Sequence, residues 1–267
     1  MLEIRNLSFS MKDVPKYWHG RGRAVSIFFD GMSVFFPAGE RFFIASVRAH
    51  LEHAGPELRR EVAAFAGQEG IHSREHDGYN EHLAEMGYPV AEMEERVERL
   101  LRRATKRLPK RRRLAVTCAL EHFTGMMAKF LLGEPKNLEG ADETMAAIWR
   151  WHAAEESEHK SVPYDVFLAA GGTWFERVST LFVTTAIFWA KVFEHQVRMM
   201  HADGCLYSAR EWWSLFHFLF VDPGSMWGLF RAFVQYLRPG FHPSDIDDGE
   251  LLEAWKRANE SAVAAAA

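Results

Sequence analysis

The chain has 267 residues, of which 48% are hydrophobic, 25% charged and 13% aromatic, and its formal net charge is −4. These values are typical of a globular protein and exclude a disordered chain, a collagen and a coiled-coil rod. Only two cysteines occur, Cys118 and Cys205, which excludes a disulfide framework and a cysteine-rich zinc site. By contrast, 13 histidines and 36 acidic residues offer nitrogen and oxygen ligands for a metal ion.

Helical patterns fill almost the whole chain, because Ala, Glu, Arg, Leu and Met dominate its long segments and no alternating strand pattern occurs. Proline and glycine are found mostly at the breaks between these segments. Pro163 falls inside one predicted helix and is expected to kink it. The predicted helices cover residues 37–54, 56–86, 90–107, 110–133, 140–170, 174–202, 209–221, 225–237 and 248–262.

Long helices joined by short turns predict an all-α protein, a ferritin-like four-helix bundle with additional C-terminal helices. We expect residues 1–267 to form a single domain, with a metal-binding helical core at 30–170 and an additional helical layer at 173–262. The N-terminus shows no targeting signal, and the longest apolar stretch, 180–193, is interrupted by Lys191 and is too short to span a membrane. We therefore expect a cytoplasmic protein without a transmembrane segment.

Glutamates and histidines recur in a fixed order along the predicted helices. A lone Glu is followed by Glu-x-x-His, and then the same order is repeated. The gap from the lone Glu to the next motif is 29 residues in the first copy and 35 in the second, about one helix and one turn. The six residues are Glu40, Glu69, His72, Glu121, Glu156 and His159.

This spacing has a direct chemical consequence. Residues i and i+3 lie on one helix face, so each Glu-x-x-His can bind one metal ion while the lone Glu of a partner helix bridges two. Four helices would then enclose two ions near the bundle axis. The alternative is a set of surface Glu/His pairs, but the apolar neighbours Phe65 and Ile71 of the first motif, and Phe42 and Phe43 after Glu40, argue against it.

The second copy carries one histidine more than the first. His152 precedes Glu156 by four residues and shares a helix face with Glu156 and His159, whereas Phe65 occupies the equivalent position before Glu69. His152 is therefore predicted to be a third ligand of the second metal ion, and a buried histidine without metal contact is the alternative. Glu155 reaches the same face and competes with Glu156 as the ligand.

Several neighbouring residues have open roles. His76 lies one turn beyond His72 and either supports the ligands or is a solvated residue. His122 is expected to point away from Glu121, and His195 to be a core or surface residue. Thr124 and the adjacent Gly125 lie one turn after Glu121, where small side chains leave space beside the metal ions or permit a close helix contact.

The six-ligand pattern resembles the ferritin-like di-iron oxygenases and oxidases. The additional His152 resembles the bacterial arylamine N-oxygenases, in which an extra histidine of the fourth helix binds one iron. From the NLSFSM opening through FPAGE and EHKSV-x-x-DV, residues 1–240 more closely resemble a bacterial family described as predicted metal-dependent hydrolases. The resemblance implies a helical metalloprotein.

Three classes of function follow. The first is a di-iron oxidoreductase that uses dioxygen as co-substrate to oxidise a small, largely apolar molecule; manganese or a mixed manganese–iron pair suits the same ligands. The second is a dinuclear metal-dependent hydrolase, as the family description states. The third is a non-enzymatic metal-binding bundle. In both enzymes the six ligands of the repeated motif would be the catalytic residues.

Two further segments point to partners. Residues Arg96–Arg113 contain ten Lys or Arg and one acid, Glu98, and form either a solvated helical turn or a docking site for an acidic partner or carrier protein. Nucleic acid is not expected, because no aromatic residue is interleaved with these charges. The aromatic-rich C-terminal third forms a covering layer, the wall of an apolar substrate site or a surface that meets lipid. A homodimer is suggested by analogy alone.

Overall fold

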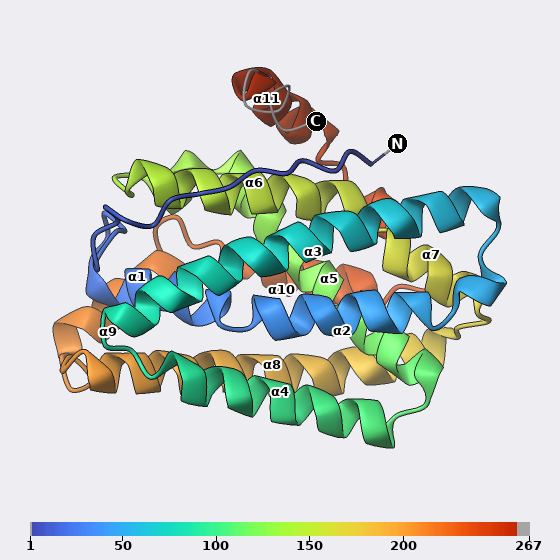
Figure 1. Cartoon of the computed structure of the whole chain (residues 1–267), viewed down its shortest axis with the longest axis horizontal. Coiled ribbons are helices and arrows are strands. Elements are labelled where there is room, and N and C mark those ends of the chain that lie inside the picture. The colour runs from blue at the N-terminus through green and yellow to red at the C-terminus, as the bar shows by residue number, and fades with distance from the viewer. Residues whose placement is uncertain (1, 261–267) are drawn as a thin grey trace.

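The structure is a computed structural model that describes residues 2–260. This part of the chain is helical and contains no strand, which confirms the all-α prediction (Figure 1). Short 3-10 turns occupy Leu51–His53, Pro135–Leu138 and Pro243–Asp245. The α-helices are α1 (Arg23–Ser33), α2 (Phe36–Arg48), α3 (Pro56–Glu85), α4 (Val90–Arg107), α5 (Lys110–Gly133), α6 (Glu143–His159), α7 (Val162–Ala169), α8 (Trp174–Ala202), α9 (Ala209–Phe220), α10 (Met226–Tyr236) and α11 (Gly249–Ala258).

Helices α2, α3, α5 and α6 form the central bundle, as predicted. α2 packs against α3 and α5, and α6 packs against α5 and α3, so each helix has two neighbours within the group. Buried aromatic side chains fill the space around them, among them Phe65 on α3, Phe123 on α5 and Trp151 on α6. Because apolar burial is the main stabilising contribution to such a bundle, these side chains hold the four helices in a fixed relation.

Local break signals place most helix ends where the sequence predicts them. α4, α5 and α8 have the predicted bounds, and α3 ends one residue early. Pro56 occupies the first turn of α3, where its missing N–H costs nothing. Thr173 caps α8 by accepting a hydrogen bond from the backbone N–H of Glu176. Gly87 has φ of 89°, a left-handed conformation that lets the chain turn away after α3.

The prediction of one kinked helix over 140–170 is wrong, because the structure has two separate helices there. α6 ends at His159 and α7 begins at Val162. Pro163 has no N–H to donate to the carbonyl of His159, and its ring would clash with that carbonyl in a continuous helix. The break leaves Lys160 at the end of α6, where its ammonium donates to Asp248 Oδ2 at 2.5 Å and to Ile246 O at 2.8 Å.

The N-terminal part differs from the prediction in two further places. The helix predicted over 37–54 begins one residue earlier and ends at Arg48, before a short turn. Helix α1 is not predicted at all. It is held by tertiary contact: Gly31 lies so close to α8 that a Cβ there would lie 3.3 Å from His195 Cβ. At the other end of the chain, the helix predicted over 248–262 ends at Ala258, and residues 261–262 lie outside the described residues.

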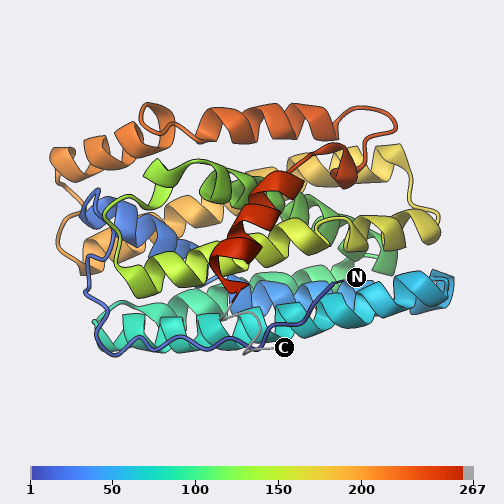
Figure 2. The ribbon, with the colours of Figure 1, turned by 90° about the horizontal axis from the view of Figure 1, so that it is seen from above.

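The remaining helices surround the central bundle. α8 packs against α5 and α1, α9 against α1, and α10 against α5. Seen from above in Figure 2, α11 crosses the bundle, where it contacts α5 and α6. The division into a core and a layer within one domain stays a prediction. Within residues 2–260, none of the helices has both the length and the apolar character needed to cross a membrane.

Candidate metal centre

The seven predicted ligands converge on the axis of the central bundle. Each of the four helices contributes at least one of them, and none of the seven is more than 3% exposed. The helices that carry these residues are therefore arranged as the repeated sequence motif predicts. The ligands are Glu40 on α2, Glu69 and His72 on α3, Glu121 on α5, and His152, Glu156 and His159 on α6.

Six of these residues form two groups in which one donor atom per residue lies within 4.8 Å of the others. The first group is Glu40, His72 and His152, and the second is Glu69, Glu156 and His159. This grouping differs from the predicted one, because His152 lies with His72 and not with His159. The two histidines are seven positions apart on α6, which is about 10 Å along the axis, so they reach different ends of the cluster.

Glu121 completes the second group. His159 Nε2 lies 3.4 Å from Glu69 Oε1, 3.6 Å from Glu121 Oε2 and 3.6 Å from Glu156 Oε1. One ring nitrogen thus faces three carboxylates from three helices. In the first group, Glu156 Oε1 also lies 3.8 Å from His72 Nδ1 and 3.0 Å from His152 Nε2. Glu156 is therefore the carboxylate that lies between the two groups.

Most donor atoms of the cluster lack a hydrogen-bond partner within the described protein; His152 Nε2 and Glu156 Oε1, which lie 3.0 Å apart, are the exception. Both carboxylate oxygens of Glu40, Glu69 and Glu121, together with Glu156 Oε2, His72 Nδ1 and His159 Nε2, are buried without a hydrogen bond. Unpaired buried polar atoms are costly, and two divalent cations would satisfy them and balance four carboxylate charges. The residues present therefore fit a pair of metal ions with mixed oxygen and nitrogen ligands.

The pKa values of the cluster's carboxyl groups are shifted by burial and by the charges of the neighbouring carboxylates. Burial, followed by the charge of Glu156, raises the pKa of Glu69 and of Glu121 well above the ordinary value, and burial with the charge of Glu156 does the same for Glu40. Burial also acts to raise the pKa of Glu156, but the hydrogen bond from His152 and the attraction of the nearby His159 and His152 rings outweigh it and hold that pKa well below the ordinary value. The cluster thus carries more negative charge than its surroundings can stabilise.

Glu155, the competing ligand, lies behind His72 instead of inside the cluster. Its Oε2 lies 2.9 Å from His72 Nε2, and its Oε1 accepts a hydrogen bond of 3.2 Å from Arg5 Nη1. A carboxylate that holds one ring nitrogen leaves the other available to a metal ion. Arg5 comes from the N-terminal segment, is fully buried and also contacts Glu158. The sequence gives no spacing signal for Arg5.

His159 is oriented in a similar way by Gln68. Gln68 Nε2 donates to the backbone carbonyl of Glu3 and to Glu158 Oε2, so its Oε1 is left to accept from His159 Nδ1 at 3.0 Å. His159 Nε2 then faces the carboxylates. Gln68 was not predicted, because a residue that directly precedes a ligand has no periodicity to mark it.

His152 is oriented by a chain of buried hydrogen bonds. Asn80 Nδ2 donates to Glu94 Oε1 at 2.9 Å, and Ser33 Oγ donates to Asn80 Oδ1 at 2.8 Å. Ser33 must therefore accept from His76 Nδ1, at 2.9 Å, which leaves His76 Nε2 to accept from His152 Nδ1, at 2.7 Å.

This direction places the Nδ1 proton of His152 on the side of His76. His152 Nε2 then faces Glu156 Oε1, and a metal ion at Nε2 would replace a proton shared with that carboxylate. His76 therefore supports His152 through this hydrogen bond and is buried, not solvated.

The other open residues lie away from the cluster. His122 Nε2 donates to the carbonyl of Ala232 at 2.9 Å, and His195 Nδ1 donates to the carbonyl of Gly31 at 2.9 Å. Burial lowers the pKa of each to about 4. Gly125 provides a close helix contact, because a Cβ there would lie 3.3 Å from Lys160 Cβ.

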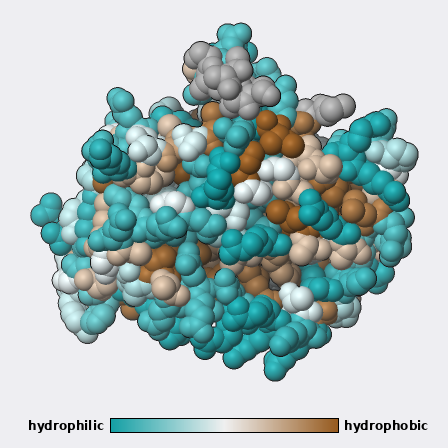
Figure 3. Space-filling model, viewed as in Figure 1, coloured by the Kyte–Doolittle hydropathy of each residue, from teal (hydrophilic) through white to brown (hydrophobic). Residues whose placement is uncertain are grey.

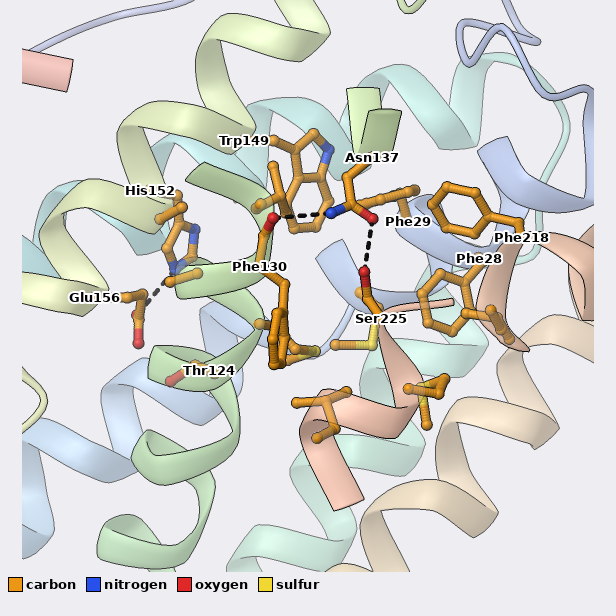
Figure 4. Close-up of a pocket in the computed structure, with 18 of the residues that line it drawn as sticks. Phe28, Phe29, Thr124, Phe130, Asn137, Trp149, His152, Glu156, Phe218 and Ser225 are labelled. Carbon is orange, nitrogen blue, oxygen red and sulfur yellow. Dashed lines mark hydrogen bonds and ion pairs between the residues drawn. The ribbon is translucent and has the colours of Figure 1, made fainter. Parts of the chain in front are cut away.

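An aromatic cavity of about 80 Å³ opens beside the cluster (Figure 4). His152 and Glu156 form its polar end, and Thr124 lines it beside them. Phe28, Phe29, Phe130, Trp149 and Phe218 supply much of its apolar wall. Phe218 belongs to the aromatic C-terminal third, whereas Trp213, Phe216, Trp227 and Phe230 of the same region are exposed. The C-terminal layer therefore contributes one wall of the cavity and also leaves aromatic surface outside it.

The four helices bury four carboxylates and three histidines that face one another. The protein is therefore a helical bundle with a candidate dinuclear metal centre. The chain belongs to the family described as predicted metal-dependent hydrolase, whose model matches residues 3–247. This confirms the family resemblance found in the sequence. Comparison with curated proteins and with solved structures gives no match.

Proposed function

We propose that the chain is a dinuclear metal-dependent hydrolase whose two metal ions are held by the seven buried ligands. The observation that carries this proposal is the set of buried donor atoms without protein partners at the end of an apolar cavity. The family description favours hydrolysis over the oxidation expected first from the ligand set. Held by these residues, two divalent cations would polarise a carbonyl or phosphoryl group as Lewis acids and lower the pKa of a water molecule.

The residues of the chain have separate tasks in this proposal. Glu155 and Gln68 hold the rings of His72 and His159, so that one nitrogen of each faces the ions. His76 keeps the Nδ1 proton of His152 away from the ions. The aromatic cavity binds the apolar part of a small substrate and keeps bulk water from it, which strengthens electrostatic interactions at the centre.

Oxidation by dioxygen at two iron ions, at two manganese ions or at a mixed pair is the second candidate. The specific observation in its favour is that all seven ligands lie on helices, in an order that resembles the ferritin-like di-iron proteins, with His152 as the additional nitrogen donor that resembles the N-oxygenases. Hydrolytic sites usually take some ligands from loops. In this candidate the aromatic cavity would hold the apolar molecule to be oxidised.

Metal-selective activity separates the two candidates. The protein is freed of metal and reloaded without oxygen with Zn²⁺, Mn²⁺ or Fe²⁺, and the hydrolysis of p-nitrophenyl esters of apolar acids is followed. If the protein is a hydrolase, it will turn over the esters with Zn²⁺ or Mn²⁺ in the absence of oxygen. This turnover should be lost in Glu40→Gln and retained in the control His122→Gln. Oxygen uptake by the ferrous protein, without ester turnover with any metal, would replace the proposal by the second candidate. Metal binding without either activity would favour a non-enzymatic bundle.

A further inference from the structure

A second, larger cavity shares Thr124 and Phe36 with the aromatic cavity. It has a volume of about 400 Å³ and runs between α2, α4, α5 and α8; we call it the long channel. Its lining is mainly apolar and includes Phe43, Leu101 and Val183. In the face shown in Figure 3, apolar side chains are visible in the region where α2 and α4 lie next to each other. A channel of this lining suits a long apolar chain.

The long channel has a direction, which α5 defines. Arg112, Val116, Leu120 and Thr124 line it and recur every four residues, so they form one stripe along α5. Twelve residues of helix cover about 18 Å. Thr124 ends the stripe one turn after Glu121 and also lines the aromatic cavity together with His152 and Glu156. The channel therefore leads from Arg112 to the wall of the candidate metal centre.

Arg112 is a half-buried cation at the far end. Its Nη1 donates to Ser179 Oγ at 2.7 Å and to Thr180 Oγ1 at 2.9 Å, and both hydroxyl residues also line the channel. Within residues 2–260, Arg112 has no carboxylate partner, although the adjacent Arg111 pairs with Glu176 at 2.9 Å. A guanidinium held in place by hydroxyl groups is suited to bind a carboxylate with two parallel hydrogen bonds.

The second cation of the lining does not compete for this role. Lys191 lies on α8, about three turns beyond Ser179 and Thr180, and its ammonium pairs with Glu194 at 2.5 Å. The surroundings of Arg112 are basic as well, since the segment Arg96–Arg113 includes the turn between α4 and α5 that lines the channel. The charges thus favour an anionic group at the Arg112 end alone.

We propose that the long channel binds a long-chain carboxylate. The carboxylate lies at Arg112, Ser179 and Thr180, and the apolar chain follows the stripe on α5 towards Thr124. Binding itself needs only these residues. The further consequence rests on the proposed function: the group to be transformed lies at the end of the chain remote from the carboxylate, because that end reaches the candidate metal centre.

Direct binding of tetradecanoate to the purified full-length protein tests this inference, with tetradecanol as a ligand of equal chain length without the charge. Arg112→Gln is expected to weaken tetradecanoate binding at least about tenfold, because a charge-assisted hydrogen bond is lost. The same substitution should leave tetradecanol binding nearly unchanged. Binding of both ligands should be lost in Val183→Trp, because the larger side chain fills the channel from its exposed wall. Binding should be retained in Val221→Trp, the matched control, since Val221 is also exposed but lines neither cavity.

Metal content is measured on the same samples, so that failure of the channel and failure of the metal centre are distinguishable. Tetradecanoate binding in a wild-type protein that takes up no metal would overturn the proposed function and leave the channel ligand intact. Unchanged tetradecanoate binding in Arg112→Gln or in Val183→Trp would overturn the inference. Binding only to vesicles of anionic lipid, and not to dissolved tetradecanoate, would also overturn it and assign the basic segment to a membrane surface.

Discussion

Each buried histidine of the cluster has one ring nitrogen occupied by a neighbour and the other directed at the carboxylates. The neighbour is Glu155 at His72 Nε2, Gln68 at His159 Nδ1 and His76 at His152 Nδ1, and each forms a hydrogen bond there. A neutral histidine can bind a metal ion only through the nitrogen without a proton. The supporting residues therefore decide which nitrogen of each histidine is available to a metal ion, although none of the three would need to touch that ion.

The support of His152 by His76 gives a prediction at this scale. His76→Phe keeps a planar ring and removes the acceptor of the His152 Nδ1 proton. We expect the affinity for the metal ion held by Glu40, His72 and His152 to fall about 10–100-fold, as is usual when a hydrogen-bond partner of a ligand is lost. Titration of the metal-free protein with Co²⁺ against a competing chelator measures this.

His122→Phe is the matched control, because His122 is buried and hydrogen-bonded but faces Ala232. Partial recovery is expected in His76→Gln, whose side-chain oxygen can accept the same proton. Equal Co²⁺ affinity in wild type and in His76→Phe would show that the hydrogen bond to His76 does not prepare His152 as a ligand.

At the scale of the helices, the sequence predicts those elements that local signals define. Proline and glycine mark the ends of α3, α4, α5 and α8, and the repeated order of a lone Glu followed by Glu-x-x-His marks the candidate ligands on four helices. The break between α6 and α7 was underestimated as a kink, because the sequence shows the missing N–H of Pro163 but not the contacts of Lys160 at the break with Ile246 and Asp248. Helix α1 was not predicted, although Gly22 directly precedes it, and it packs against α8.

The same limit applies to the candidate site. Periodicity identifies residues that share a helix face, so it predicts the ligands and the apolar character of their surroundings. It does not predict which ligands from different helices face one another, and the grouping of His152 with His72 instead of His159 is an example. Arg5 and Gln68 reach the site from an irregular segment and from a position without a motif, so only the tertiary structure places them there.

A glycine contact between irregular segments gives a prediction about packing. A Cβ on Gly20 would lie 2.5 Å from the backbone oxygen of Glu139 and 2.9 Å from Gly140 Cα. Because backbone cannot rotate away as a side chain can, Gly20→Ala is expected to lower the free energy of unfolding by about 1–3 kcal/mol. Urea denaturation measures the change.

Gly78→Ala on α3 is the comparison, since a Cβ there meets no atom within 4 Å. It is expected to raise the free energy of unfolding by up to about 1 kcal/mol, because alanine favours the helix. If Gly20→Ala were as stable as wild type, the close approach of the N-terminal turn to the segment before α6 would be incorrect.

For the molecule as a whole, the cluster links stability to pH and to metal. Glu40, Glu69 and Glu121 have pKa values raised well above the ordinary value, mainly by burial, and burial raises the pKa of Asp30 to about 7. A carboxyl with a raised folded-state pKa stabilises the fold below its unfolded-state pKa, and this contribution is lost as the pH rises through the folded-state value. The metal-free protein should therefore lose stability towards alkaline pH.

Thermal denaturation at about pH 7 and about pH 9 tests this relation. The metal-free protein is expected to melt at a lower temperature at the higher pH. Bound metal ions should remove most of that decrease, because they bind the ionised carboxylates of the native state. Asp30→Asn, which removes the buried carboxyl outside the cluster, should keep the metal-dependent part. A metal-free protein that is more stable at about pH 9 would contradict the assigned pKa directions.

The central claim is that seven buried side chains hold two metal ions, and metal content per chain tests it most directly. The wild-type protein is dialysed to equilibrium against saturating Fe²⁺ and analysed beside Glu69→Ala, His152→Ala and the control His122→Gln, whose residue is buried but faces Ala232. We predict two ions per chain in wild type and in His122→Gln, and a loss of at least one ion in Glu69→Ala and in His152→Ala. A single ion per wild-type chain, or two ions retained in Glu69→Ala, would contradict the dinuclear centre.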